Sequence, residues 1–169
     1  RKWMSTLKDL LKFSFDRIKE RRGVLNGKEK DPYDTFSKIS SVQKQFPQTK
    51  VFWLIGKWGK KDRNISIHNT EHRKLIKSLF DDGMEIGLHP SFGSFNMKET
   101  VNQEKRELEA VCEKGITLSR QHFLRFQVSS TFSDLLKNGF TDEYSMGFAE
   151  HVGFRSGTAR AHKWFDLSI

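Results

Sequence analysis

An α/β fold with a mainly parallel sheet is predicted by two features of this 169-residue sequence. Helical and strand-like segments alternate along the chain, the pattern of strands joined by crossover helices. The first strand segment, Val51-Phe52-Trp53-Leu54-Ile55, is a continuous apolar run, as expected for a central strand covered on both faces. Strands are therefore expected near 50–56, 84–89, 116–122, 140–146 and 163–168.

Amphipathic helices are predicted between these strands, because apolar residues recur there at a spacing near 3.6. The strongest local signals are caps: Asp31-Pro32 predicts a helix start, Pro47 a helix end, and Asn69 or Thr70 an N-cap. The expected helices cover 3–22, 31–46, 71–80, 98–113 and a short segment from Ser129 or Ser130 to Asn138.

The length and an apolar content of 36% predict a single domain over 1–169 with a substantial core, preceded within it by an N-terminal helix and loop over 1–30. The sequence contains no run of about 18 apolar residues, so no membrane span is expected. The first residues lead into a charged amphipathic pattern, so no signal peptide is expected. The chain opens on Arg1 instead of Met, which suggests a fragment and leaves its localisation, cytoplasmic or envelope-associated, open.

The net charge of +9 raises nucleic acid or an anionic surface as a partner. Against nucleic acid, Lys and Arg are spread over nearly every predicted helix, and no aromatic-flanked basic block resembles an RNA-binding signature. The single cysteine, Cys112, excludes an internal disulfide and a multi-cysteine metal site. Solvated helix faces account for most of the charge.

A histidine occupies the end of one predicted strand. Gly83-Met84-Glu85-Ile86-Gly87-Leu88-His89-Pro90-Ser91 follows a helix and delivers His89 to the last strand position. Ligands of α/β folds gather at the carboxyl ends of strands, so this position favours a functional residue. The alternative is a histidine that is merely hydrogen-bonded where a loop begins.

That stretch resembles the second motif region of the polysaccharide deacetylases with NodB homology, carbohydrate esterase family 4, in a bacterial branch. Further blocks, in matching order, extend the resemblance from Asp31 to Leu167. They are Asp31-Pro32-Tyr33-Asp34-Thr35-Phe36, Asp62-Arg63-Asn64-Ile65-Ser66, Ser119-Arg120-Gln121-His122-Phe123-Leu124-Arg125-Phe126, and Tyr144-Ser145-Met146-Gly147 through Gly153-Phe154-Arg155-Ser156-Gly157-Thr158.

The resemblance implies a partial or distorted seven-stranded (β/α) barrel, lacking its first strand, that removes N-acetyl groups from a polysaccharide. A divalent metal, zinc or similar, would polarise the amide carbonyl and activate water. His89 matches the family's first metal ligand, but Gly93 stands where the second histidine is expected, so His122 is the candidate replacement. Arg120 matches the third-motif arginine by order. Two further arginines, Arg125 and Arg155, are candidates for catalytic positions.

The family's Asp-containing first motif is not assigned. Phe80-Asp81-Asp82-Gly83 spells part of it, but these residues end a predicted helix and precede His89 by a few positions. We interpret them as a helix terminus with Gly83 in a left-handed conformation. The catalytic Asp is expected upstream of Arg1, which would leave this fragment inactive.

Strand alternation supports a site near the third predicted strand. With a period of two, Ile116, Leu118, Arg120 and His122 share one face, and Thr117, Ser119, Gln121 and Phe123 share the other. The polar pair Arg120 and His122 would then open on the site above two apolar residues. A structural histidine is the alternative for His122.

Candidate substrate-binding residues lie in the loops around these strand ends: Lys57, Arg63, Ser91, Ser94 and His151. Loop solubility explains the lysine and arginine equally well. Three functions remain open. They are a metal-dependent polysaccharide deacetylase, a deacetylase-like domain that binds polysaccharide without catalysis, and a basic nucleic-acid-binding domain. The sequence does not indicate an oligomeric state.

Overall fold

The computed structural model describes residues 15–57 and 60–165. The chain divides into two compact units, Arg1–Val42 and Gln43–Ile169, and each is described by itself. The boundary lies at residue 42, beyond the N-terminal helix and loop expected over 1–30. The expectation of a single domain over 1–169 stays a prediction.

The first unit contains the α2 helix, Phe15–Leu25, and the beginning of α3, Phe36–Gln45. The N-terminal part of the predicted helix over 3–22 lies outside the described residues. The prediction that Asp31 caps a helix is wrong. Its carboxylate accepts the amide of Tyr33 at 2.9 Å, and its carbonyl accepts the amide of Asp34 at 3.0 Å. This tight turn uses Asp31 as its acceptor, so α3 begins five residues later than Asp31.

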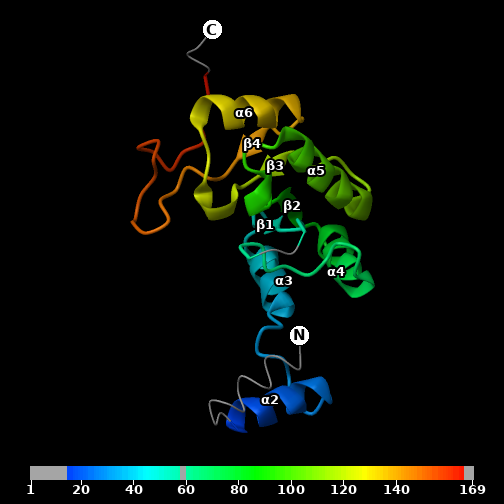
Figure 1. Cartoon of the computed structure of the whole chain (residues 1–169). Coiled ribbons are helices and arrows are strands. Elements are labelled where there is room, and N and C mark those ends of the chain that lie inside the picture. Colours follow the sequence, from blue (N-terminus) through cyan, green and yellow to red (C-terminus); the bar gives the residue numbers. More distant parts are fainter. Residues whose placement is uncertain (1–14, 58–59, 166–169) are drawn as a thin grey trace. The chain divides into compact units, whose positions relative to one another are not determined.

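The second unit is built on a four-stranded parallel sheet (Figure 1). Its strands are β1 Lys50–Trp53, β2 Glu85–Leu88, β3 Leu118–Ser119 and β4 Asp142–Glu143. They are connected by helices α4 Thr70–Asp81, α5 Lys98–Cys112 and α6 Val128–Lys137. The mixed α/β class with parallel strands is therefore confirmed.

The strands are hydrogen-bonded in chain order, β1-β2-β3-β4, with parallel pairing throughout. This is the order in which strands follow one another around a (β/α) barrel. Four strands in the described residues do not make a closed barrel of seven, and that closure stays a prediction. The central place predicted for β1 is wrong: it pairs with β2 alone among the described strands, and its residues are half-buried.

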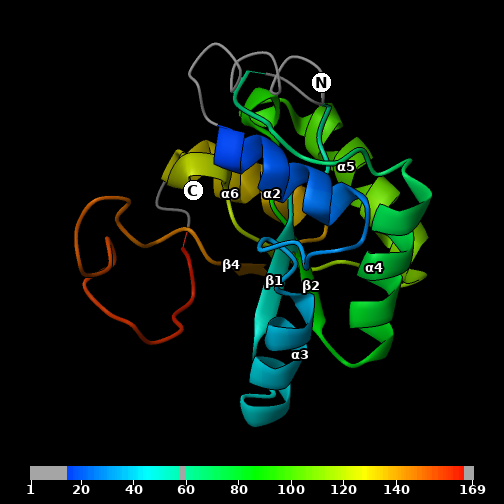
Figure 2. The same ribbon diagram turned by 90° about the horizontal axis from the view of Figure 1, so that it is seen from below.

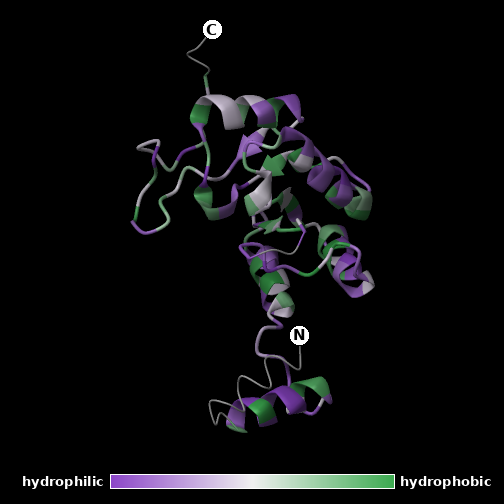
Figure 3. Ribbon diagram, in the orientation of Figure 1, coloured by the Kyte–Doolittle hydropathy of each residue, from purple (hydrophilic) through white to green (hydrophobic). Residues whose placement is uncertain are grey.

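The core of this unit lies between the sheet and its helices. Its fully enclosed side chains include Ile76, Leu88, Leu108 and Cys112, where α4 packs on α5 and α5 packs on β2. Burial raises the pKa of the Cys112 thiol to about 11, as suits a small apolar core residue. Figure 3 shows hydrophilic residues along α4 and α5 and more apolar colours in the strands beside them.

Both ends of α4 agree with the sequence prediction. Asn69 is the N-cap, and its side-chain oxygen accepts the amide of His72 at 2.9 Å. At the other end Gly83 has a φ of 88°, and its amide donates to the Phe80 carbonyl. The helix-terminus interpretation of Asp81-Asp82-Gly83 is thus confirmed, and the glycine is required by its left-handed backbone.

The third strand is much shorter than predicted. It ends at Ser119, and a 3₁₀ turn, η2 His122–Leu124, replaces the expected extension to residue 122. Phe123 and Leu124 have φ values of 55° and 50°, which breaks the period of two. Ser119 and Gln121 are both buried and Arg120 between them is exposed, as the predicted alternation requires, but the alternation does not continue through the turn to His122 and Phe123.

No strand is assigned over 147–165 in the described chain, apart from an isolated antiparallel bridge between Gly147 and Phe154. Figures 1 and 2 both show this orange-to-red segment extending away from the sheet. The predicted strand over 163–168 is therefore wrong for residues 163–165, and the remainder lies outside the described residues. None of the described helices is long and apolar enough to cross a membrane.

Candidate functional site

Polar side chains from three parallel strands meet at the carboxyl edge of the sheet. His89 directly follows β2, His122 lies in the turn after β3, and Asp62 comes from the loop after β1. Each of these segments leaves the sheet at the same edge, because the strands are parallel. The sheet thus brings together residues separated by as many as 60 positions.

The two histidines expected to meet are in direct contact. Nδ1 of His122 lies 2.8 Å from Nε2 of His89, and the two rings meet edge to face with centroids 4.8 Å apart. Nδ1 of His89 lies 2.5 Å from the carbonyl oxygen of Arg120. Their convergence was predicted from strand order, although the turn that carries His122 was not.

The direction of these hydrogen bonds follows from chemistry. A carbonyl oxygen accepts only, so Nδ1 of His89 carries a proton and donates to Arg120. Burial lowers the pKa of His89, which favours its neutral form with a lone pair on Nε2. That lone pair accepts the Nδ1 proton of His122. A neutral His122 therefore has its own lone pair on Nε2.

Nε2 of His122 faces two oxygen acceptors. It lies 3.5 Å from Oδ1 of Asp62 and 3.4 Å from the carbonyl oxygen of Lys61. A lone pair directed at a carboxylate and a carbonyl is electrostatically unfavourable unless a positive charge lies among them. This position therefore suits a bound metal cation.

Asp62 is a site residue that the sequence analysis missed. It is 7% exposed, and its Oδ1 accepts the amide of Phe92 at 2.8 Å, so the carboxylate also holds the loop after β2. Asp62 lies within one of the quoted motif blocks and is flanked by Lys61 and Arg63. An acidic residue in a basic loop at a strand end was the available signal.

A side chain of α5 holds the loop after His89 in place. The buried carboxylate of Glu104 accepts the amide of Ser91 at 3.0 Å, and Oγ of Ser94 donates to the Ser91 carbonyl at 2.7 Å. Burial raises the pKa of Glu104. Ser91 and Ser94 are buried and hydrogen-bonded within the loop, so they shape the loop in this structure. Substrate contact by Ser91 and Ser94 stays a prediction.

A second buried polar cluster lies between β3 and β4. The Glu143 carboxylate accepts hydrogen bonds from the hydroxyls of Ser119 and Ser145 and from the side-chain amide of Gln121, the last at 3.3 Å. Burial raises the pKa of Glu143. Gln121 lies between Arg120 and His122, so this cluster fixes the backbone that carries both of them. Sequence analysis missed Glu143 and placed Gln121 on a face of an extended strand.

The three candidate arginines occupy different positions. Arg120 is exposed, and its guanidinium donates to the Tyr144 carbonyl at 3.1 Å. Arg125 stacks over the rings of Phe92 and Phe95. Arg155, from the long segment after β4, donates to the Leu124 carbonyl at 3.1 Å and thus supports the turn after His122.

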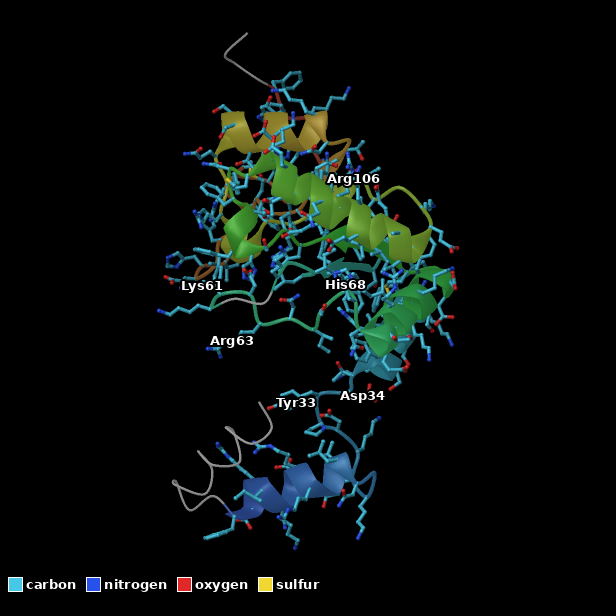
Figure 4. All side chains as sticks on the ribbon, turned by 45° about the vertical axis from the view of Figure 1, so that its right-hand side comes forward. Tyr33, Asp34, Lys61, Arg63, His68 and Arg106 are labelled. Atoms are coloured by element: carbon cyan, nitrogen blue, oxygen red, sulfur yellow. The ribbon has the colours of Figure 1, made fainter. Side chains whose placement is uncertain are left out.

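The remaining predicted binding residues are exposed. Lys57 and Arg63 lie in the loop after β1, and Figure 4 shows Lys61 and Arg63 projecting from this segment. His151 contacts Phe148 with ring centroids 6.5 Å apart, and no contact with His89 or His122 is recorded for it in the described chain. Lys57, Arg63 and His151 therefore belong to the surroundings of the histidine pair at most.

Within residues 15–57 and 60–165, no group of three or more His, Cys, Asp or Glu side chains is arranged to hold a metal ion. The candidate site instead offers one imidazole, one carboxylate and one backbone carbonyl, with a second imidazole behind the first. Comparisons of the chain with protein-family models, curated proteins and solved structures give no match.

Proposed function

We propose that this chain carries the metal-binding part of a polysaccharide deacetylase-type site, in which His122 and Asp62 bind a divalent cation. The observation that carries the proposal is the convergence of three acceptor atoms, Nε2 of His122, Oδ1 of Asp62 and the carbonyl oxygen of Lys61. The quoted motif blocks support the assignment to deacetylase-type chemistry. The proposal thus joins an arrangement of atoms to a sequence resemblance.

The spacing of the acceptors suits a metal of the zinc type. Ligand atoms at about 2.0–2.2 Å from a tetrahedral ion lie roughly 3.3–3.6 Å from one another. The distances from Nε2 of His122 to its two oxygen neighbours are 3.4 and 3.5 Å, whereas the two histidine nitrogens are 2.8 Å apart. The ion is therefore assigned to the Asp62 side of His122.

His89 then acts through His122. By accepting the Nδ1 proton of His122, it selects the tautomer that leaves Nε2 free for a cation. The Arg120 carbonyl in turn fixes the ring of His89. The expectation that His89 itself binds the metal becomes the competing assignment, and variants distinguish the two.

In amide hydrolysis a bound divalent ion supplies a polarised carbonyl and a more acidic water. The chain's own contribution is to hold that ion at the sheet edge through His122, Asp62 and the Lys61 carbonyl, while the Arg120 guanidinium donates to the Tyr144 carbonyl. No Asp among the described residues is assigned as the base. The proposed reaction consumes water and converts the N-acetyl group of a sugar into a free amine and acetate.

The test is direct titration of the 169-residue chain with Zn²⁺ and Co²⁺, followed by calorimetry and by the visible spectrum of Co²⁺. We expect binding to be lost in His122→Ala and in Asp62→Asn. His89→Gln should weaken it by about 10–100-fold, the range typical of groups that orient a ligand. His68→Ala is the matched control, because His68 is exposed and lies on the same loop (Figure 4).

Two results separate the assignments. If His89→Gln abolishes binding as fully as His122→Ala, the ion lies between the histidines and our placement is wrong. If the wild-type chain binds neither ion, the metal proposal fails. In wild-type protein that does bind the metal, release of acetate from an N-acetylated polysaccharide would be evidence for hydrolysis.

A second candidate is a polysaccharide-binding domain without catalysis. One observation favours it: the described residues supply two side-chain ligands instead of three. Release of acetate from an N-acetylated polysaccharide by the metal-loaded chain would exclude this second candidate.

A further inference from the structure

Aromatic rings and cations gather in a single cluster beside the histidine pair. We define this rim cluster as Lys61, Phe92, Phe95, Phe123 and Arg125. Nζ of Lys61 lies 5.7 Å from the ring centroids of both Phe92 and Phe123. The Arg125 guanidinium lies 4.5 Å from the centroid of Phe92 and 3.9 Å from that of Phe95. Two positive charges thus share one ring.

Neither cation of the rim cluster is neutralised by a carboxylate in the described part of the chain. Among residues 15–57 and 60–165, the ion pairs of the second unit involve other side chains, and neither Nζ of Lys61 nor the guanidinium of Arg125 forms a hydrogen bond. The Arg125 guanidinium lies over two aromatic rings, which restrict its position without using its N–H donors. A planar guanidinium held in this way is prepared for a carboxylate or another oxyanion.

Phe123 adds an exposed aromatic surface. It is 58% exposed although its ring contacts Phe92 and His122, at centroid distances of 5.8 and 4.4 Å. Its φ of 55° lies in the left-handed region, which a bulky residue adopts at an energetic cost. A left-handed backbone and an exposed ring at the same aromatic residue point to a surface kept for a ligand.

We infer that the rim cluster is a binding subsite for an anionic glycan, with Lys61 and Arg125 holding its acidic groups and Phe123 stacking on a sugar face. The inference rests on the proposed function in taking a polysaccharide as the partner. It adds the substrate class: a polymer that carries carboxylates near the sugar presented to the histidine pair. The cluster and the pair are adjacent, because Lys61 and Phe123 each contact His122.

Single-stranded nucleic acid is the competing ligand, since it also uses stacked bases and cations. The small number of cations in the rim cluster disfavours nucleic acid. Nucleic-acid affinity comes from many phosphate contacts along a basic track, whereas this cluster contains two cations around one ring. An acidic sugar beside the histidine pair requires no more than that.

The experiment measures binding of the 169-residue chain to polygalacturonate, to neutral N-acetylchitooligosaccharides and to single-stranded RNA, at physiological salt. We expect polygalacturonate to bind at least tenfold more tightly than the neutral oligosaccharide. Lys61→Ala/Arg125→Ala should weaken polygalacturonate binding at least tenfold, and Phe123→Ala at least threefold. Arg125→Lys retains the charge but loses the planar fork, so an intermediate loss is expected.

The matched control is Arg106→Ala/Lys137→Ala, which removes the same charge from exposed positions on α5 and α6 (Figure 4 labels Arg106). Binding within twofold of wild type is expected for it. Equal losses in control and rim variants would reduce the effect to net charge and overturn the inference. Tighter binding of RNA with the same variant pattern would assign the cluster to nucleic acid.

Metal titration of the same variants separates this inference from the proposed function. The Arg125 side chain supplies none of the three acceptor atoms of the metal site, so zinc binding should be unchanged in Arg125→Ala. Zinc binding without any preference for the acidic polymer would sink the subsite and leave the metal proposal standing. Rim-dependent polygalacturonate binding without zinc binding would do the reverse.

Discussion

Two polar clusters lie a few residues apart in the second unit, and they differ in how their hydrogen bonds end. Around Glu143, three donors from Ser119, Gln121 and Ser145 converge on one carboxylate, and every partner is protein. Around His122, a chain of donors ends on a lone pair that faces two further acceptors. The hydrogen bonds of the first cluster all end on protein groups, whereas the acceptors of the second converge on a position that suits a cation.

This difference separates a structural role from a functional one more clearly than residue type does. A satisfied buried network stabilises the fold and specifies its register. A site with converging acceptors leaves an interaction to be made by a ligand. The two clusters are also connected, since Gln121 belongs to the Glu143 network and precedes His122 in sequence. Four predictions test this comparison through stability measurements.

The largest effect is expected from Glu143→Ala. It leaves three donors of buried residues without their acceptor, at a cost of about 3 kcal/mol in the free energy of unfolding. Urea unfolding measures the change. Glu150→Ala, an exposed position on the following segment, should change stability by less than about 0.5 kcal/mol. Equal, small changes in both variants would show that the Glu143 network is not structural.

Gly56→Ala should come next, because a Cβ there would lie 2.3 Å from Cβ of Ser91 and 2.8 Å from Oε1 of Glu104. The loop that follows His89 must then shift, with a loss of about 2 kcal/mol. Gly93→Ala is the control in the loop that follows His89, since a Cβ at Gly93 would meet nothing within 4 Å. Unfolding midpoints in urea that fall equally for both would contradict the close approach described at Gly56.

Glu104→Gln should change the pH dependence of stability. Burial raises the pKa of Glu104 in the folded state above its ordinary value of 4.5. The folded chain therefore keeps this proton where the unfolded chain has lost it, so stability decreases as pH rises from 4.5 through the folded-state pKa. Glutamine does not ionise and still offers an oxygen to the Ser91 amide.

The measurement for Glu104→Gln is a series of urea unfolding curves from acidic to neutral pH. The stability of the variant relative to wild type should increase with pH over that window and then level off. A difference that decreases with pH would mean that the carboxylate is favoured in its charged form at this site.

The smallest effect concerns the backbone of Phe123. Phe123→Asn and Phe123→Ala both remove the ring, but asparagine tolerates a left-handed conformation better than alanine. We expect the Asn variant to be more stable than the Ala variant by about 0.5 kcal/mol. At Thr117, an exposed position before β3 without a positive φ, the same pair of substitutions should not favour asparagine.

The fold was predictable where elements are long or carry a cap. Helices α4, α5 and α6 appear within about two residues of their predicted bounds, because periodicity and the Asn69 cap act locally. The short β3 and β4 were overestimated, since the Glu143 network ends the extended backbone and depends on residues more than twenty positions apart. The edge position of β1 also depends on the pairing of distant strands, so the local apolar run of β1 could not predict it.

The site was predictable in part. His89 and His122 were expected at a common edge from strand order alone, and the structure brings them into contact. Asp62 was missed because its role depends on the amide of Phe92 and on Nε2 of His122, neither of which is near in sequence. The left-handed turn at Phe123 was missed because no glycine or asparagine signals it.

The order of the strands also bears on how the chain is made. Strands β2, β3 and β4 each pair with the strand synthesised just before them, across a connection that contains one α-helix. During translation, each of these strands therefore finds its partner already outside the ribosome. The sheet can thus grow one unit at a time, and His122 reaches His89 once the third strand has been added.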